Sequence, residues 1–291
     1  SPSDPLFSGL FSTSDVQYLI GNKTNELGTI SASVLYENQL LQIPALSVNT
    51  PLGSSTGSLS YPYDLRWVVA DGDSTPIDTR YTASLVMDNL AVAPLREFIE
   101  VMPADLDGLI RGQVNLTGST TNAEDLTGTV VLDSLKLFGL QNELLSTRPI
   151  RLAFNAGYIE TDSLEMVIRR IDQPDDERGR FTAHGRLVYR ADEAHNLESD
   201  FNILGKDITM EAVLALANVD LPLSGMMNSR IHIFGPPEDR AVDTRFVLNQ
   251  VLYNDAVIDS ITGRVVYEYR DIVIHALQIW TGENTLVAYG S

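Results

Sequence analysis

Apolar and polar residues alternate with a period of two along most of this chain of 291 residues. The segment "LDGLIRGQVNLTGS", 106–119, places aliphatic residues and glycines on one parity and mostly Asp, Arg, Gln, Asn and Thr on the other. The alternation recurs in "RPIRLAFN", "SLEMVIR", "RFTAHGRLVY", "SDFNIL" and "SITGRVVYEY". A period of two is typical of strands with one buried face, and the intervening turn clusters suit hairpins rather than crossover helices. The pattern predicts a mostly antiparallel, all-β fold.

Two short segments follow a helical period instead. In the first, "APLREFIEVMP", the apolar residues at i, i+3, i+4 and i+7 are Leu95, Phe98, Ile99 and Met102. In the second, "ITMEAVLALANVDLP", they are Ala212, Ala215, Leu216 and Val219. A proline follows each segment, Pro103 or Pro222, and would end the helix there. The sequence therefore predicts two short amphipathic helices, and we expect their apolar faces to plug or pack against the sheet.

The helical segment and the glycine-containing strand repeat together. Laying Gly108 on Gly225, an offset of 225 − 108 = 117 residues, preserves the apolar parity of the strand and also aligns the two helical segments. Farther along, "DSLEMVI" aligns with "HALQIWT" and "RFTAHG" with "TLVAYG", while "NQLLQIPALSVNTPLGSSTGSLSY" is an earlier partial copy. The sequence predicts a partial N-terminal β repeat at 1–88, a complete repeat at 89–206, and a second repeat, truncated at its C-terminus, at 207–291.

Composition and charge exclude several classes of function. With 20 basic and 39 acidic residues, the formal charge is −19, which repels nucleic-acid phosphates. The chain lacks cysteine, and its four histidines show no metal-ligand spacing. It has neither a nucleophile elbow nor a phosphate-binding glycine loop, and its acidic clusters lack the calcium-loop pattern. We therefore expect no enzyme, no cofactor, no metal and no nucleic-acid partner.

The ends of the chain and its hydropathy bear on its context. No stretch approaches the roughly 18 apolar residues of a membrane-spanning helix. The last residues, "ENTLVAYGS", stop within a strand-like alternation and would leave an unprotected sheet edge. We therefore expect these residues to be a segment of a longer chain.

The repeated order of elements resembles a known family. The short helix "LREFIEVMPADLDG", the glycine-containing strand "GLIRGQVNLTGS", the strand pair "RPIRLAFNAGYIETDSLEMVI" and the closing "GRFTAHGRLVY" resemble the repeats of the AsmA-like superfamily, in particular the TamB type. The resemblance covers most of 26–291 and lies in small and apolar positions, not in a catalytic motif. The second copy departs from the pattern, with Ser229 in place of Gly112 and Arg245 in place of Gly128.

The resemblance implies an elongated, curled antiparallel sheet of tandem repeats, a β-taco, with an apolar open groove along its concave face. It implies a location in the periplasm of a bacterial cell envelope, within a longer membrane-anchored chain. It also implies transport of phospholipid acyl chains between the inner and outer membranes, and an outer-membrane β-barrel partner. Glycines in the strands would let the wall bend and would leave room for acyl chains.

Under this hypothesis the lipid-binding residues are large side chains on the apolar parity of the strands. They are Leu106, Ile110, Val114, Leu116, Ile150, Leu152, Phe154, Leu164, Met166, Ile168, Phe181, Leu187, Leu223, Met227, Ile231 and Ile233.

Two other readings of the pattern remain open. Alternating aliphatic residues also line the closed, dry core of any β-sandwich. The chain would then be a structural or chaperone module for outer-membrane protein assembly, whose strand edges add onto client strands. The third reading is a surface adhesin built of β repeats.

Overall fold

The computed structural model describes residues 6–20, 23–37, 39–50, 53–63, 79–92, 107–122, 125–139, 142–172, 177–190, 197–216, 219, 221–254, 256–269 and 271–290. At 15–20, 23–27, 213, 215 and 216 it describes the backbone alone. The described ranges contain seventeen strands, the helix α1 and the short 3-10 turn η4. Every strand pair with a given register is antiparallel, so the predicted all-β antiparallel fold is confirmed.

The chain divides into two compact units. The first unit comprises Ser1–Ala91, Ile110–Leu132 and Ala153–Ala156, and the second comprises Val92–Leu109, Asp133–Leu152 and Gly157–Ser291. This division groups strands by packing, whereas the predicted repeats group them by sequence similarity. The boundaries of the three repeats therefore stay a prediction.

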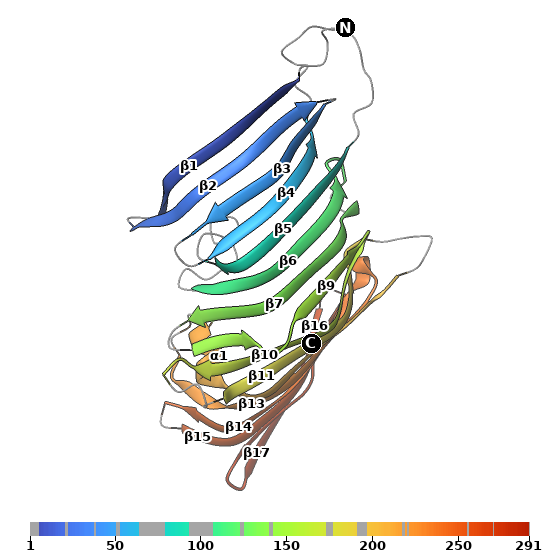
Figure 1. The fold of residues 1–291 in the computed structure, drawn as a ribbon. Coiled ribbons are helices and arrows are strands. Elements are labelled where there is room, and N and C mark those ends of the chain that lie inside the picture. Colours follow the sequence, from blue (N-terminus) through green and yellow to red (C-terminus); the bar gives the residue numbers. More distant parts are fainter. Residues whose placement is uncertain are drawn as a thin grey trace. The chain divides into compact units, whose positions relative to one another are not determined.

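The first unit contains a meander of five strands that pair in chain order (Figure 1). These strands are β1 (Phe7–Ile20), β2 (Lys23–Glu37), β3 (Leu40–Asn49), β4 (Ser54–Pro62) and β5 (Arg80–Ala91). Three further strands have residues in both units: β6 (Asp107–Ser119), β7 (Thr127–Gly139) and β9 (Ile150–Asn155).

The register gives the first unit two faces of different chemistry, because directly opposed residues of an antiparallel pair lie on the same face. One face carries apolar residues in cross-strand rows, such as Phe11, Ala32, Leu46, Gly57 and Leu85. The other face carries hydroxyl groups in the adjacent row, Ser12, Ser31, Ser47 and Thr56. We call this second surface the hydroxyl face.

The second unit contains a longer antiparallel meander, in which β10 to β17 pair in chain order and β8 pairs with β10 (Figure 1). The strands are β8 (Asn142–Ser146), β10 (Tyr158–Arg170), β11 (Glu177–Val188), β12 (Ser199–Thr209), β13 (Leu223–Gly235), β14 (Ala241–Tyr253), β15 (Ala256–Glu268), β16 (Asp271–Thr281) and β17 (Asn284–Gly290). The two remaining elements are α1 (Met210–Leu216) and η4 (Pro237–Asp239). The five alternating segments identified in the sequence all form strands, in β9, β10, β11, β12 and β15.

The helix α1 covers part of one face of the second sheet. It follows β12 directly and contacts β8, β12 and β13. Ala212 of α1 packs with Ile168 and Ile208, and all three side chains are 0% exposed. The second predicted helix is thus confirmed over Met210–Leu216. Leu216 was expected to pack against the sheet, but its side chain lies outside the described part of the structure. The first predicted helix, with Leu95, Phe98, Ile99 and Met102, lies outside the described residues.

One assignment in the second helix is wrong. Val219 was expected to pack against the sheet, but it is 43% exposed. The reason is that α1 ends at Leu216, one turn earlier than the apolar spacing indicates, so Val219 lies beyond the helical surface that faces the strands.

Candidate functional site: an apolar face of the second unit

The apolar side chains of the second unit align across neighbouring strands. Starting from Ile203 in β12, the opposed residues are Ile231, Thr244, Val265 and Ile274 on successive strands. Three parallel rows flank this one, and together they form a surface that we call the apolar face. Its members include Leu144, Leu164, Met166, Ile168, Phe181, Ala183, Phe201, Ile203, Ile208, Met227, Ile231, Ile233, Val242, Thr244, Phe246, Leu248, Ile261, Val265, Tyr267, Ile272, Ile274, Leu277, Ile279 and Leu286.

The structure brings many of the predicted lipid-binding residues onto this one face. Those whose register or strand parity places them there are Leu164, Met166, Ile168, Phe181, Leu187, Leu223, Met227, Ile231 and Ile233. Ile150 and Leu152 also belong to the second unit, in β9, where Ile150 is buried and Leu152 half-buried. Leu106 lies outside the described residues.

The remaining predicted residues belong to the first unit. They are Ile110, Val114 and Leu116 of β6, and Phe154 of β9. The hydroxyl group of Ser84 in β5 donates a hydrogen bond of 2.8 Å to Oδ1 of Asn115 in β6. This bond places Asn115 on the hydroxyl face. The even-numbered aliphatic residues of β6 therefore lie on the opposite, apolar side of that unit. The predicted residues thus divide between the two units.

Sequence reasoning missed about two thirds of the apolar face. The largest omitted side chains include Ile203, Phe246, Leu248, Leu277 and Ile279. The signal that could have found them is the same period of two, in "DTRFVLNQV" of β14 and "IVIHALQI" of β16. Neither segment carries the glycine spacing on which the repeat comparison was based.

Only one end of the apolar face is deeply buried. Leu144, Phe181 and Met227 pack around the core beneath α1. Farther across the sheet, Ile231 and Leu277 are half-buried, and Ile272 and Leu286 are 60% and 58% exposed. Among the described elements, α1 is the helix that contacts these strands. The apolar face is therefore covered at β8–β12 and accessible to solvent toward β17.

Two strand glycines, Gly118 and Gly263, do not leave the space that was expected beside them. A Cβ atom at Gly118 would lie 2.6 Å from the hydroxyl oxygen of Tyr81. A Cβ atom at Gly263 would lie 2.4 Å from Cζ of Phe246, its directly opposed residue in β14. An aromatic ring thus occupies the space above each glycine. At these two positions the expected room for an acyl chain is absent, because the ring packs on bare backbone.

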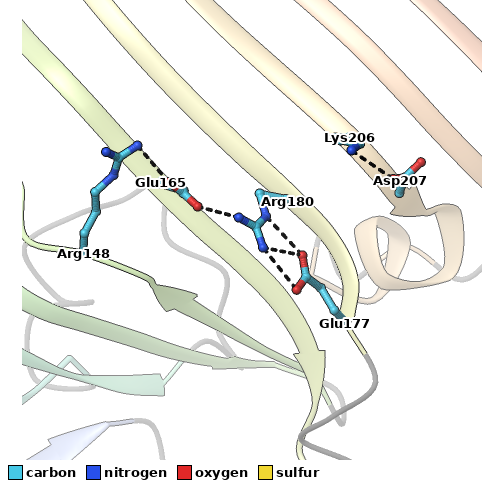
Figure 2. A network of polar contacts seen from close by, with 6 residues as sticks. All are labelled: Arg148, Glu165, Glu177, Arg180, Lys206 and Asp207. Atoms are coloured by element: carbon cyan, nitrogen blue, oxygen red, sulfur yellow. Dashed lines mark hydrogen bonds and ion pairs between the residues drawn. The ribbon is translucent and has the colours of Figure 1, made fainter.

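The reverse side of the second sheet is charged, and we call it the polar face. Figure 2 shows one of its ion-pair networks, on β10 and β11. Glu165 accepts from Arg148 at 2.8 Å and from Arg180 at 2.7 Å, and Arg180 also contacts Glu177 at 3.1 Å. Hydrogen bonding to Glu177, with the charges of both carboxylates, raises the pKa of Arg180 above its ordinary value. The positive charges of two arginines and the negative charges of two carboxylates cancel in this network.

Comparisons with known proteins leave the family open: no family model, curated protein or solved structure matches this chain. Within the described ranges, no helix is long and apolar enough to cross a membrane. The same ranges contain no group of three or more histidine, aspartate or glutamate side chains arranged to hold a metal ion.

Proposed function

We propose that the apolar face of the second unit binds phospholipid acyl chains, and that the chain is a segment of a lipid-transfer protein of the bacterial cell envelope, with AsmA-like repeats. The observation that carries the proposal is the alignment of mostly apolar side chains in cross-strand rows that α1 covers at one end only. A sheet face of this kind is costly to leave in water, and extended apolar surfaces of soluble proteins often mark binding sites.

The energetics of acyl-chain binding favour such a surface. Burial of one CH₂ group contributes about 0.8 kcal/mol, so passage of a sixteen-carbon chain through water would cost on the order of 12 kcal/mol. An apolar sheet face removes much of that cost without a covalent step. Because rows of similar aliphatic side chains succeed one another from β11 to β17, a chain would meet similar contacts along its path.

The dimensions of the sheet also suit an acyl chain. Strands lie about 4.8 Å apart, so the four steps from β13 to β17 span roughly 19 Å. The hydrocarbon core of a bilayer is about 30 Å thick, which leaves roughly half of that for the acyl chains of one leaflet. The accessible part of the face is therefore long enough to hold a single acyl chain.

Lipid binding can be tested with two neighbouring residues of β12. Ile203 lies half-buried on the apolar face, whereas Leu204 lies on the reverse side of the same strand and is 40% exposed. We expect native mass spectrometry of the purified chain to detect bound phospholipid. Ile203→Asp should reduce the bound fraction at least tenfold, because an unpaired carboxylate would have to be desolvated against hydrocarbon. Leu204→Asp introduces the same charge and should leave lipid binding unchanged.

The outcomes separate the proposal from its main alternative. Equal lipid loss in both variants, or no phospholipid on the unaltered chain, would contradict lipid binding at the apolar face. A scaffold or assembly chaperone instead predicts binding to unfolded β-barrel proteins through strand edges, with no dependence on Ile203. Far-UV circular dichroism of both variants controls for loss of the sheet.

A further inference from the structure

The polar face carries a second feature, far along the sheet from the balanced network of Figure 2. Arg230 of β13 is directly opposed to Arg245 of β14, which is directly opposed to Arg264 of β15. Like charges in directly opposed positions destabilise a sheet. Three arginines in one row are notable in a chain with 39 acidic and only 20 basic residues.

The row borders a hollow in the polar face. The hollow has a volume of about 480 Å³, within the range of small-molecule sites, which is roughly 300–1,000 Å³. Its walls include all three arginines and the neighbouring row, which consists of Asn228, Val247, Thr262 and Gln278. No carboxylate is among the described residues that line it. We call this hollow, with Arg230, Arg245 and Arg264, the arginine hollow.

The charges beside the arginine hollow are not balanced. Asp243 forms ion pairs of 3.1 Å with both Arg245 and Arg264. Arg230 donates to the neutral amide oxygen of Asn202 at 3.2 Å. The Asp200 carboxylate lies next to this group, accepting from the Asn202 amide at 3.2 Å and contacting Nε2 of His232 at 2.9 Å. Three guanidinium groups and two carboxylates therefore leave a local charge of 3 − 2 = +1. A smaller hollow of about 110 Å³, lined by Arg230, His232, Asp243 and Arg245, adjoins the row.

We propose that the arginine hollow binds a phosphate group, either as free phosphate or as the headgroup of an anionic phospholipid. Guanidinium groups match the oxygen geometry of phosphate and form paired, charge-assisted hydrogen bonds with it. The side chains of Asn228, Thr262 and Gln278 supply further donors on the opposite wall. A bound phosphate group would neutralise the excess positive charge of the row, which gives a physical reason for three opposed arginines.

The site is independent of the proposed lipid-binding face. Arg245 and Phe246 are consecutive residues of β14, so their side chains lie on opposite faces of the sheet. An acyl chain on the apolar face would therefore not occupy the arginine hollow, and the two sites can be tested separately.

The test uses inorganic phosphate, titrated into the purified chain by isothermal calorimetry at low ionic strength, where screening is weak. Arg230→Gln is the principal variant, because it removes a guanidinium without breaking the ion pairs of Asp243. We expect at least tenfold weaker phosphate binding. Arg180→Gln is the matched control, because Arg180 lies on the same face but is held by two carboxylates. It should bind phosphate as the unaltered chain does.

A second arm identifies the source of the phosphate group. Phosphatidylcholine vesicles with and without phosphatidic acid are sedimented with the chain, and the increment due to phosphatidic acid is measured. An increment that Arg230→Gln abolishes supports a lipid headgroup, whereas saturable binding of inorganic phosphate without that increment supports a free phosphate. Ile203→Asp should affect neither result, so failure of the lipid-binding proposal is distinguishable. Absence of both signals, or their persistence in Arg230→Gln and Arg245→Gln, would overturn the site.

Discussion

The two ends of the apolar face use the same residue types and differ in burial. Beneath α1, Ile168 and Ile208 are fully buried, whereas Ile272 in β16 and Leu286 in β17 are more than half exposed. Both ends belong to alternating strands, so strand pattern determines which face is apolar at either end. Burial depends on whether another element covers that face. A short helix thus separates a structural core from an accessible apolar surface on one continuous sheet side.

This difference assigns different roles to similar side chains. Packing under α1 stabilises the second unit, because each buried aliphatic side chain there is removed from water on all sides. Side chains toward β17 retain exposed apolar area that folding has not used. That area is available to a ligand, and its burial would stabilise the complex instead of the fold.

The largest expected effect is the loss of a buried side chain at the covered end. Ile168→Ala removes three carbon atoms from the core with Ile208 and Ala212 and should lower the free energy of unfolding by roughly 2–5 kcal/mol. Leu286→Ala is the control at the open end and should change it by about 0.5 kcal/mol or less. Urea denaturation of both variants measures the difference. Similar losses at the two positions would show that the open end is also structurally packed.

A smaller effect is expected from displacing the cover itself. Ala212→Leu places a larger side chain against Ile168 and Ile208 and should cost about 1–3 kcal/mol through overpacking. Binding of a hydrophobic dye should rise, because a displaced α1 extends the accessible face. Glu211→Leu adds the same side chain at the adjacent exposed position, and it should change the unfolding free energy by less than about 1 kcal/mol. Unchanged dye binding in Ala212→Leu would argue that α1 does not limit the accessible face.

Much of the fold was predictable from the sequence because alternation is a local property. The parity of β6, β11 and β13 followed directly from their glycines and aliphatic residues. Cross-strand alignment was not predictable, since it depends on bulges. In β10, a register shift between Thr161 and Leu164 moves the inward positions from odd to even numbers. A sequence comparison without the structure cannot detect such a switch.

The apolar face and the arginine hollow also differ in how far the sequence predicts them. Members of the apolar face carry their own signal, a period of two, and many were identified. The arginine row carries none, because Arg230, Arg245 and Arg264 are separated by 15 and 19 residues and meet only through the registers of two hairpins. Seen in the sequence alone, each is an ordinary polar residue on the outward side of a strand.

The smallest expected effect concerns the polar face behind the accessible end. Burial raises the pKa of Asp243, whereas hydrogen bonds and positive charges from Arg264 and Arg245 lower it. The lowering effects together exceed the effect of burial, so the pKa lies below the ordinary value of 3.8. A carboxyl whose pKa is lower in the folded state stabilises the fold above its unfolded pKa. That stabilisation is lost as the pH falls through the folded-state pKa. It should not exceed about 1 kcal/mol, because both arginines are half exposed.

Asp243→Asn should therefore weaken the fold slightly at neutral pH and have less effect as the solution is acidified below about pH 4. Urea denaturation at several pH values, for this variant and the unaltered chain, measures the change. Asp88→Asn is the control. Asp88 forms an ion pair of 3.5 Å with Arg111, and the side chains of both residues are exposed to solvent. If the two unfolding profiles of Asp243→Asn and the unaltered chain ran parallel through the acid range, Asp243 would not stabilise this end. Converging profiles would show that the ion pairs of Asp243 stabilise the sheet at β14 and β15.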